Sequence, residues 1–369
     1  PASAEGTVGM IYKAVNLVDK RIADVFSCKP PLNLDHEPDR ELFTESSIPH
    51  VYSLHHSAFR PFIAELADTT IVTGQALVFS RVNGHVDFIL DSYHDGVLAQ
   101  TIVPIAPRIG PLQSVVGEYV IEANLPTAPA YEGPVVLIAS PHADNYHHWI
   151  LETMTRFWVY DEYPDLVRGL PIMLPPLTHR YQKETLDRFV PSGVDVMIHY
   201  REFPSIVKRA IFPSFLASSG HSRKQLDWLR AKLLARSPIA ELGGRLYISR
   251  EDSQNGRRLS NEGELWAKLE SFGFTRIVAS RLRHDEQVDL FTDAQIILGV
   301  SGAGITNHIF APEGAHVIEL HPRDYTNRAH FFTTNLLDQT YQFVICDRDL
   351  MGDMIAPVER ISACIERVL

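Results

Sequence analysis

The chain lacks the features that mark several common classes of protein. It has three cysteines, Cys28, Cys346 and Cys364, an odd number without a C-x-x-C pair, so neither a disulfide framework nor a cysteine zinc site is indicated. No run reaches the roughly 18 apolar residues that a membrane-spanning helix requires. The opening residues show no charged-then-apolar signal pattern. These absences favour a reducing compartment, and we expect a cytoplasmic location.

Positive charge is also scarce. The 34 lysines and arginines are outnumbered by 45 aspartates and glutamates, which gives a formal net charge of −11. This balance argues against general binding to nucleic acid or to an anionic membrane. The remaining composition, with 45% hydrophobic and 21% charged residues, is typical of a globular protein. A chain of 369 residues is expected to form two domains.

The order of sequence patterns divides the chain into three parts. Residues 1–130 contain a helical pattern over 15–26 and then short β-like pieces separated by turn residues, which predicts a mixed, β-rich accessory region. Strand and helix patterns alternate over 131–242 and again over 243–369, where a helix closes the chain. We therefore predict an α/β fold with two doubly wound parallel-sheet domains, Rossmann-like, facing across a cleft. Ligands of such sheets bind at the carboxyl ends of the strands.

The strongest local signal is a turn of small residues late in the chain. Strands are predicted over 295–300 and 316–320, and between them Ser301, Gly302, Ala303 and Gly304 lead into a helix over 305–310. Glycines without a Cβ let a ligand approach the backbone, and the N–H groups that open a helix attract an anion such as a diphosphate. A tight connection with no ligand explains the same glycines, so the flanking sequence has to decide.

Polar residues near this turn are candidates for ligand contacts. Thr306 and Asn307 lie in the predicted helix, where their side chains could reach ligand oxygens. Glu319 ends the second strand and could accept hydrogen bonds from ribose or sugar hydroxyls, or be a structural carboxylate. Between a strand and a capped helix, Arg250, Arg257 and Arg258 supply guanidinium groups suited to bidentate phosphate contacts. A solvated arginine-rich face is the alternative.

A second polar cluster follows the first predicted strand of residues 131–242. His148 and Glu152 are four residues apart, so they share one face of a helix. A carboxylate beside an imidazole is a plausible general base with its orienting partner, and a simple helix-capping pair is the alternative. Asp144, Asn145 and His147 lie just before this pair. The spacing is not the H-E-x-x-H of a zinc site.

Together the three clusters resemble glycosyltransferase family 61. That family shows an N-Y-Y-H-W-L-L-E type motif, a Y-I-S-R motif followed by R-R-L-x-N-E, and a G-x-H-G-A-G-L-T-N motif that continues to P-E-G-A-H-V-I-E-L. This chain has N-Y-H-H-W-I-L-E at 145–152, Y-I-S-R at 247–250, R-R-L-S-N-E at 257–262, and G-V-S-G-A-G-I-T-N at 299–307 continuing through P-E-G-A-H-V-I-E-L at 312–320. The resemblance covers residues 135–322.

The resemblance implies a GT-B architecture and an inverting, metal-independent transfer from a nucleotide sugar, with a uridine diphosphate sugar as our expectation for the donor. Residues 131–242 would form the acceptor-side domain and 243–369 the donor-binding domain. The expected donor contacts are Arg250, Arg257, Arg258, Ser301, Gly302, Ala303, Gly304, Thr306, Asn307 and Glu319. The expected catalytic residues are Glu152 as base, His148 as its orienting partner, and Asp144; the acceptor side would add Asn145 and His147.

The same resemblance implies the cofactors and partners. No metal and no cofactor are expected beyond the donor itself. The partners would be the nucleotide sugar and a glycan acceptor, with no nucleic acid. A lipid-linked or polysaccharide acceptor would bring the protein to a membrane peripherally. The expected process is bacterial capsular or other surface-polysaccharide synthesis.

Three alternatives stay open at this point. The family usually has histidine where this chain has Ser301, which keeps a non-catalytic relative that binds a sugar nucleotide or glycan in view. Residues 299–303 approximate the G-x-S-x-G elbow of α/β hydrolases, with Asp324 and His330 following in the expected order. Residues 347–349 read D-R-D, formally the D-x-D metal motif of another glycosyltransferase fold.

Overall fold

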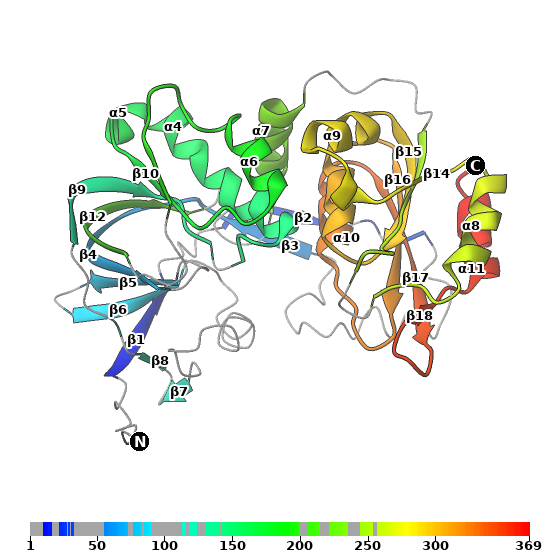
Figure 1. The fold of residues 1–369 in the computed structure, drawn as a ribbon, viewed down its shortest axis with the longest axis horizontal. Helices are drawn as coiled ribbons and strands as arrows, with labels where there is room; N and C mark the ends of the chain where they lie inside the picture. Colours follow the sequence, from blue (N-terminus) through cyan, green and yellow to red (C-terminus); the bar gives the residue numbers. More distant parts are fainter. Residues whose placement is uncertain are drawn as a thin grey trace, which may run out of the picture. The chain divides into compact units, whose positions relative to one another are not determined.

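The chain forms two compact units in a computed structural model (Figure 1). One unit comprises Pro1–Asp24 and Ala58–Gly220, and the other Val25–Ser57 and His221–Leu369. The second boundary between the two units therefore falls between Gly220 and His221, earlier in the chain than the boundary expected between residues 242 and 243. The structure describes residues 10–16, 22–27, 29, 31–32, 55–72, 77–82, 85–90, 113–115, 118–123, 125, 130–140, 142–198, 205–214, 221–234, 244–253 and 257–369.

The first unit is built on one ten-stranded sheet with the order β11-β10-β9-β12-β4-β5-β6-β1-β8-β7. Its strands are β1 (Met10–Asn16), β4 (Ile63–Val72), β5 (Leu77–Val82), β6 (His85–Leu90), β7 (Gln113–Val115), β8 (Glu118–Ala123), β9 (Ala130–Leu137), β10 (Ile172–Leu174), β11 (Val196–Ile198) and β12 (Ser205–Pro213). Strands β11, β10, β9 and β12 are parallel neighbours, as are β1 and β6, and the other pairings are antiparallel. The sheet is mixed, whereas a parallel sheet was expected.

The antiparallel pairing of β4 with β12 joins residues expected in different domains. It runs from Ile63 opposite Pro213 to Ile71 opposite Ser205. The β-rich region predicted for 1–130 is therefore continuous with the sheet that follows it. The helix predicted over 15–26 is wrong, because β1 and β2 (Ile22–Ser27) occupy its described ends, and β2 pairs with β3 (His55–Phe59) in a small sheet.

Helices cover one side of the parallel part of this sheet (Figure 1). After β9 the chain forms α3 (Tyr146–His148), a π-helical turn η2 (Trp149–Thr153), a 3₁₀ turn η3 (Met154–Phe157), α4 (Trp158–Glu162) and α5 (Pro164–Val167). Helix α6 (Arg180–Leu186) follows β10. The helix predicted directly after the strand at 135–139 is thus present, but it changes its winding in the middle.

The second unit is a doubly wound sheet with the order β14-β13-β15-β16-β17-β18. The first five strands are parallel and β18 is antiparallel. In order of appearance the parallel strands lie 2-1-3-4-5, a common doubly wound topology. The elements are α7 (Arg223–Leu233), β13 (Gly244–Ile248), α8 (Glu262–Ser271), β14 (Thr275–Ile277), η4 (Ala279–Arg281), α9 (His284–Thr292), β15 (Ala294–Val300), η5 (Ala303–Phe310), β16 (His316–Pro322), α10 (Ala329–Leu336), β17 (Thr340–Arg348), β18 (Met354–Ile355) and α11 (Val358–Glu366).

Strand alternation gives the two faces of this sheet different chemistry. Ile318 and Leu320 of β16 join the apolar core that also contains Leu265 of α8 and Ile361 of α11. Because successive side chains of a strand point to opposite faces, Glu319 lies on the other face. In Figure 1, α9 and α10 lie on the side of the sheet away from α8 and α11. The strand–turn–helix–strand unit predicted for 293–322 is confirmed, with a 3₁₀ helix after the turn.

The topology of this sheet determines where a ligand would bind. From β13 the chain crosses to β14 at one edge and returns to β15 on the other side of β13. The strand order therefore reverses between β13 and β15, and open α/β sheets bind ligands at the carboxyl ends of strands at such a reversal. Among the described residues, no helix is long and apolar enough to cross a membrane.

Candidate functional site

The reversal point brings Arg250 directly against the small-residue turn. Arg250 follows β13 and Gly302 follows β15. A Cβ added to Gly302 would lie 1.7 Å from Arg250 Nη1 and 2.8 Å from its Cζ. The backbone at Gly302 is extended, with φ 163°, so the space taken by Arg250, and not the backbone conformation, favours glycine here. The Arg250 guanidinium therefore occupies the volume that any larger residue at position 302 would fill.

A second arginine is held on the same turn. Arg257 Nη1 donates to the carbonyl oxygen of Ser301 at 3.1 Å, and its guanidinium lies over the Tyr325 ring at 5.6 Å. Arg250 Nη2 donates to Ser253 Oγ at 3.1 Å. Burial, followed by the charge of Arg257, lowers the pKa of Arg250 to about 10. Arg250 therefore remains cationic at neutral pH, and two positive groups meet at the turn.

The third predicted arginine has a different neighbour. Arg258 is exposed and its Nη2 lies 3.8 Å from Asp353 Oδ2. Arg276 and Arg281 each form a 2.7 Å ion pair with Glu251. The structure thus holds Arg250 and Arg257 on the turn and directs Arg258 toward a carboxylate.

The predicted contacts within the turn divide into two groups. Gly302, Ala303 and Gly304 are partly exposed, so their backbone is accessible. Thr306 and Asn307 are buried, and Asn307 Nδ2 donates to Gln287 Oε1 at 2.7 Å. These two side chains support the turn from inside the protein. Ser301 is also buried, at 3% exposure.

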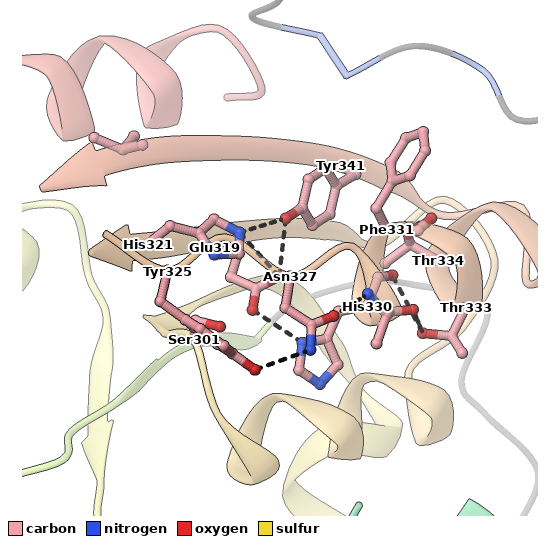
Figure 2. Close-up of polar contacts among 12 residues, drawn as sticks. Ser301, Glu319, His321, Tyr325, Asn327, His330, Phe331, Thr333, Thr334 and Tyr341 are labelled. Atoms are coloured by element: carbon pink, nitrogen blue, oxygen red, sulfur yellow. Dashed lines mark hydrogen bonds and ion pairs between the residues drawn. The ribbon is translucent and has the colours of Figure 1, made fainter. Parts of the chain in front are cut away.

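Glu319 is buried in the centre of a polar network behind the turn (Figure 2). Its exposure is 0%, and it accepts hydrogen bonds from His330 Nδ1 at 2.9 Å and from Tyr341 Oη at 2.8 Å. Burial would raise the pKa of Glu319, but His330, His321 and hydrogen bonds that include one from Ser301 lower it to about 2. Both oxygens of the carboxylate are used within the protein, so its geometry does not support the expected contact with a ribose.

Three residues of this network were not predicted to meet Glu319, although His330 was considered for the hydrolase alternative. His330 comes from α10, Tyr341 from β17 and His321 from β16. His321 Nε2 lies 3.0 Å from Tyr341 Oη, and burial lowers the pKa of His321. His330 Nε2 lies 3.4 Å from Thr306 Oγ1, which links the network to η5. The sequence signal for this network was the H-V-I-E-L-H-P segment of β16, where Glu319 and His321 interrupt an otherwise apolar, buried strand.

The hydrolase alternative fails on these contacts. His330 is engaged by Glu319 and Thr306. Asp324 instead accepts hydrogen bonds from Arg348 Nε at 2.9 and 3.0 Å. A Ser301–His330–Asp324 triad is therefore not assembled.

The D-R-D sequence is likewise part of local structure. Asp347 is paired with Arg323, and Asp349 Oδ1 accepts the backbone N–H groups of Met351 and Asp353 at 2.8 and 3.0 Å. The first carboxylate is thus neutralised by an arginine, and the second closes a turn.

The first unit carries the predicted histidine–glutamate pair on an unusual helical turn. Asn145 caps α3 by accepting the N–H of His147 at 2.9 Å. The chain then enters the π-helical turn Trp149–Thr153, a rare winding that is frequent at functional sites. His148 Nδ1 lies 2.8 Å from Glu152 Oε1, and the two side chains are 33% and 24% exposed. The pairing expected from the i, i+4 spacing is present, and solvent reaches both groups.

Neighbouring groups affect the protonation of this pair. Partial burial would lower the pKa of His148, but the charge of Glu152, its hydrogen bond and the charge of Asp144 raise it overall. Burial and the nearby His148 lower the pKa of His142, whose ring centroid lies 5.0 Å from that of His148. The His147 ring lies 5.3 Å from the His148 ring. Among the described residues, no group of three histidine, cysteine or acidic side chains is arranged to hold a metal ion.

Fold and site together define an α/β protein with two large sheets, one of which has a doubly wound topology and carries two arginines on its turn. Residues 146–318, a little under half of the chain, match the family model Glycosyltransferase 61, so this part of the chain is similar to that family. The match contains the whole second motif group, at 247–262, and most of the first and the third. This confirms the family resemblance seen in the sequence. A search of the curated proteins found no match.

Proposed function

We propose that this protein is an inverting glycosyltransferase of GT-B type that needs no metal and transfers a sugar from a uridine diphosphate sugar to a glycan hydroxyl. We further propose that it acts in the synthesis of a surface polysaccharide. The observation that carries the proposal is the position of Arg250 against Gly302, at the reversal of strand order between β13 and β15. The family match makes the diphosphate of a nucleotide sugar the natural anion for that position.

The donor side of the mechanism rests on positive charge. As the bond between the anomeric carbon and the β-phosphate oxygen breaks, the nucleoside diphosphate takes the electron pair and gains negative charge. Arg250 and Arg257 would stabilise that charge with planar guanidinium groups, which match phosphate geometry. The first N–H groups of η5 would add to this stabilisation. The first N–H groups of a helix have no partner within the helix, so they can donate hydrogen bonds to an anion.

The acceptor side requires a base, and the contacts favour His148 for this role. Glu152 was the expected base. However, Glu152 Oε1 engages Nδ1 of His148, which fixes the tautomer and leaves Nε2 to accept a proton. In this scheme Nε2 takes the proton of the acceptor hydroxyl as its oxygen bonds to the anomeric carbon. Glu152 then stabilises the imidazolium that forms.

The donor proposal is tested by thermal shift and by calorimetry. We expect uridine diphosphate to raise the melting temperature equally with and without EDTA, because a ligand at 100 times its Kd adds about 2.7 kcal/mol of stability. Arg250→Ala should abolish the shift. The matched control is Arg245→Ala, at the amino end of the same strand, where Nη1 donates to the carbonyl of Phe272. A shift that survives in Arg250→Ala would refute the assignment of this arginine.

Transfer is tested separately from binding. The donor that gives the shift is incubated with a panel of nitrophenyl glycosides, and release of nucleoside diphosphate is measured. Transfer that is lost in His148→Ala supports the catalytic proposal. Donor binding without transfer to any acceptor would instead favour the non-catalytic relative that Ser301 keeps in view.

A further inference from the structure

Two aromatic rings lie beside the loop that leads to the histidine–glutamate pair and have no role in the proposed transfer. His179 is exposed and Tyr181 is partly exposed. Their rings are stacked, with centroids 5.3 Å apart and an interplanar angle of 8°. We call these two residues the aromatic ledge. His179 is the N-cap of α6, in a capping box with Gln182, which holds its backbone beside Tyr181 while its ring stays exposed.

The ledge is rigidly attached to the loop that leads to His148. Tyr181 Oη donates to the carbonyl oxygen of Asp144 at 2.7 Å. The buried Tyr146 meets the Tyr181 ring edge-on, with centroids 5.1 Å apart and an angle of 89°. Burial raises the pKa of Tyr181, so its hydroxyl keeps the proton that it donates. The hydroxyl end of the Tyr181 ring and its contact with Tyr146 are therefore in place before any ligand arrives.

The topology explains why ledge and pair lie together. Strands β9 and β10 are parallel neighbours, with Val136 beside Ile172, so the loops that follow them emerge at the same edge of the sheet. Side-chain bonds join the two segments further along: Gln182 Nε2 donates to the carbonyl of Ala143 at 2.7 Å, and Trp149 Nε1 to Thr185 Oγ1 at 2.8 Å. The ledge and the segment that carries the pair are thus joined at several points in the first unit.

We infer that His179 and Tyr181 form a platform on which a pyranose ring of the acceptor glycan stacks. The C–H bonds on one face of a pyranose carry partial positive charge, and the face of an aromatic ring is negative, so the two attract. A ring fixed in advance loses little entropy when the sugar binds. The exposed Asp144 and Asn145 border the ledge and offer oxygen and amide groups to sugar hydroxyls.

This inference rests on the proposed function only in naming the ligand as the acceptor. Its test therefore uses sugar binding without donor and without turnover. Saturation-transfer NMR is recorded on the full chain with a panel of methyl glycosides of glucose, galactose, mannose, fucose and N-acetylglucosamine. We expect at least one glycoside to bind, with strongest transfer to the protons of one ring face.

Substitutions decide whether the ledge is the binding surface. His179→Ala should weaken binding by about tenfold, which is near the upper end of what one aromatic contact contributes. His179→Phe should restore it, because stacking needs a flat ring and not a hydrogen bond. Tyr163→Ala is the control, since Tyr163 is an aromatic residue of the same unit with 50% exposure. Tyr181→Phe keeps the ring and should bind, even if Tyr181→Ala disturbs the fold.

The outcomes separate this inference from the donor proposal. If no glycoside binds, or if His179→Ala binds as tightly as the unmodified chain, the ledge is not a sugar platform, whatever uridine diphosphate does. If glycosides bind and require His179 while no nucleotide binds, the ledge stands and the donor proposal fails.

Discussion

Replacing Gly302 with alanine would test the link between the small-residue turn and Arg250. The added Cβ would lie 1.7 Å from Arg250 Nη1 and 2.8 Å from Cζ, far inside van der Waals contact. The atoms it meets are the end of a flexible side chain, so Arg250 can move away. Because φ at residue 302 is 163°, alanine adopts the same backbone without strain. The substitution should therefore displace the arginine and preserve the fold.

The size of the effect follows from the contact that is lost. A hydrogen bond to a charged group contributes about 1.5–3 kcal/mol, which corresponds to a weakening of uridine diphosphate binding by about 10- to 150-fold. Calorimetric titration of the variant with uridine diphosphate measures this directly. The melting temperature without ligand should change little.

A matched glycine provides the control. A Cβ at Gly263, in the first turn of α8, would meet nothing within 4 Å, so Gly263→Ala should bind uridine diphosphate as the unmodified chain does. If Gly302→Ala also binds at full affinity and melts at the same temperature, Arg250 does not hold the diphosphate from its position on the turn. That result would refute the central step of the donor proposal.

Three further predictions address the buried network and the histidine–glutamate pair. The pKa of Glu319 is about 2 in the folded chain against an ordinary 4.5, so the stability that its charge contributes is present above pH 4.5 and is lost as the pH falls toward 2. Glu319→Gln should therefore lower the free energy of unfolding by at most about 3 kcal/mol at neutral pH. Melting temperatures that fall equally with acid in the variant and in the unmodified chain would contradict this. Glu152→Gln should lower the raised pKa of His148, which NMR titration of the ring measures. It should also remove the stability that the pair contributes below pH 6.5 and that is lost as the pH rises through the raised pKa. An unchanged titration would show that the pair does not interact. A fluorophosphonate probe should leave Ser301 unlabelled, because its side chain is hydrogen-bonded to Glu319, and labelling would revive the hydrolase alternative.

Local patterns predicted the parts of the site that depend on neighbours in the chain. The apolar run of β15, the small-residue turn and the start of β16 were recognisable because strand, turn and helix preferences act over a few residues. The pairing of His148 with Glu152 was predictable for the same reason, since residues four apart meet on any helix. The π-helical winding between them has no comparable signature.

The architecture of the first unit was much harder to predict. The helix expected over 15–26 gave way to strands because β1 pairs with β6 and β8, more than 70 residues away. The continuous sheet depends on β4 finding β12 across about 140 residues. An apolar strand pattern indicates that a strand forms but does not specify its partner.

The sequence by itself determined the family resemblance, the strand–turn–helix unit of the proposed donor site and the spacing of the histidine–glutamate pair. Tertiary structure decided which predicted residues are exposed and which are buried. It turned Thr306, Asn307 and Glu319 inward, and it supplied His330 and Tyr341 from other elements to satisfy the Glu319 carboxylate. The physical reason is that a buried charge requires partners. Those partners come from strands and helices that only the folded sheet brings together.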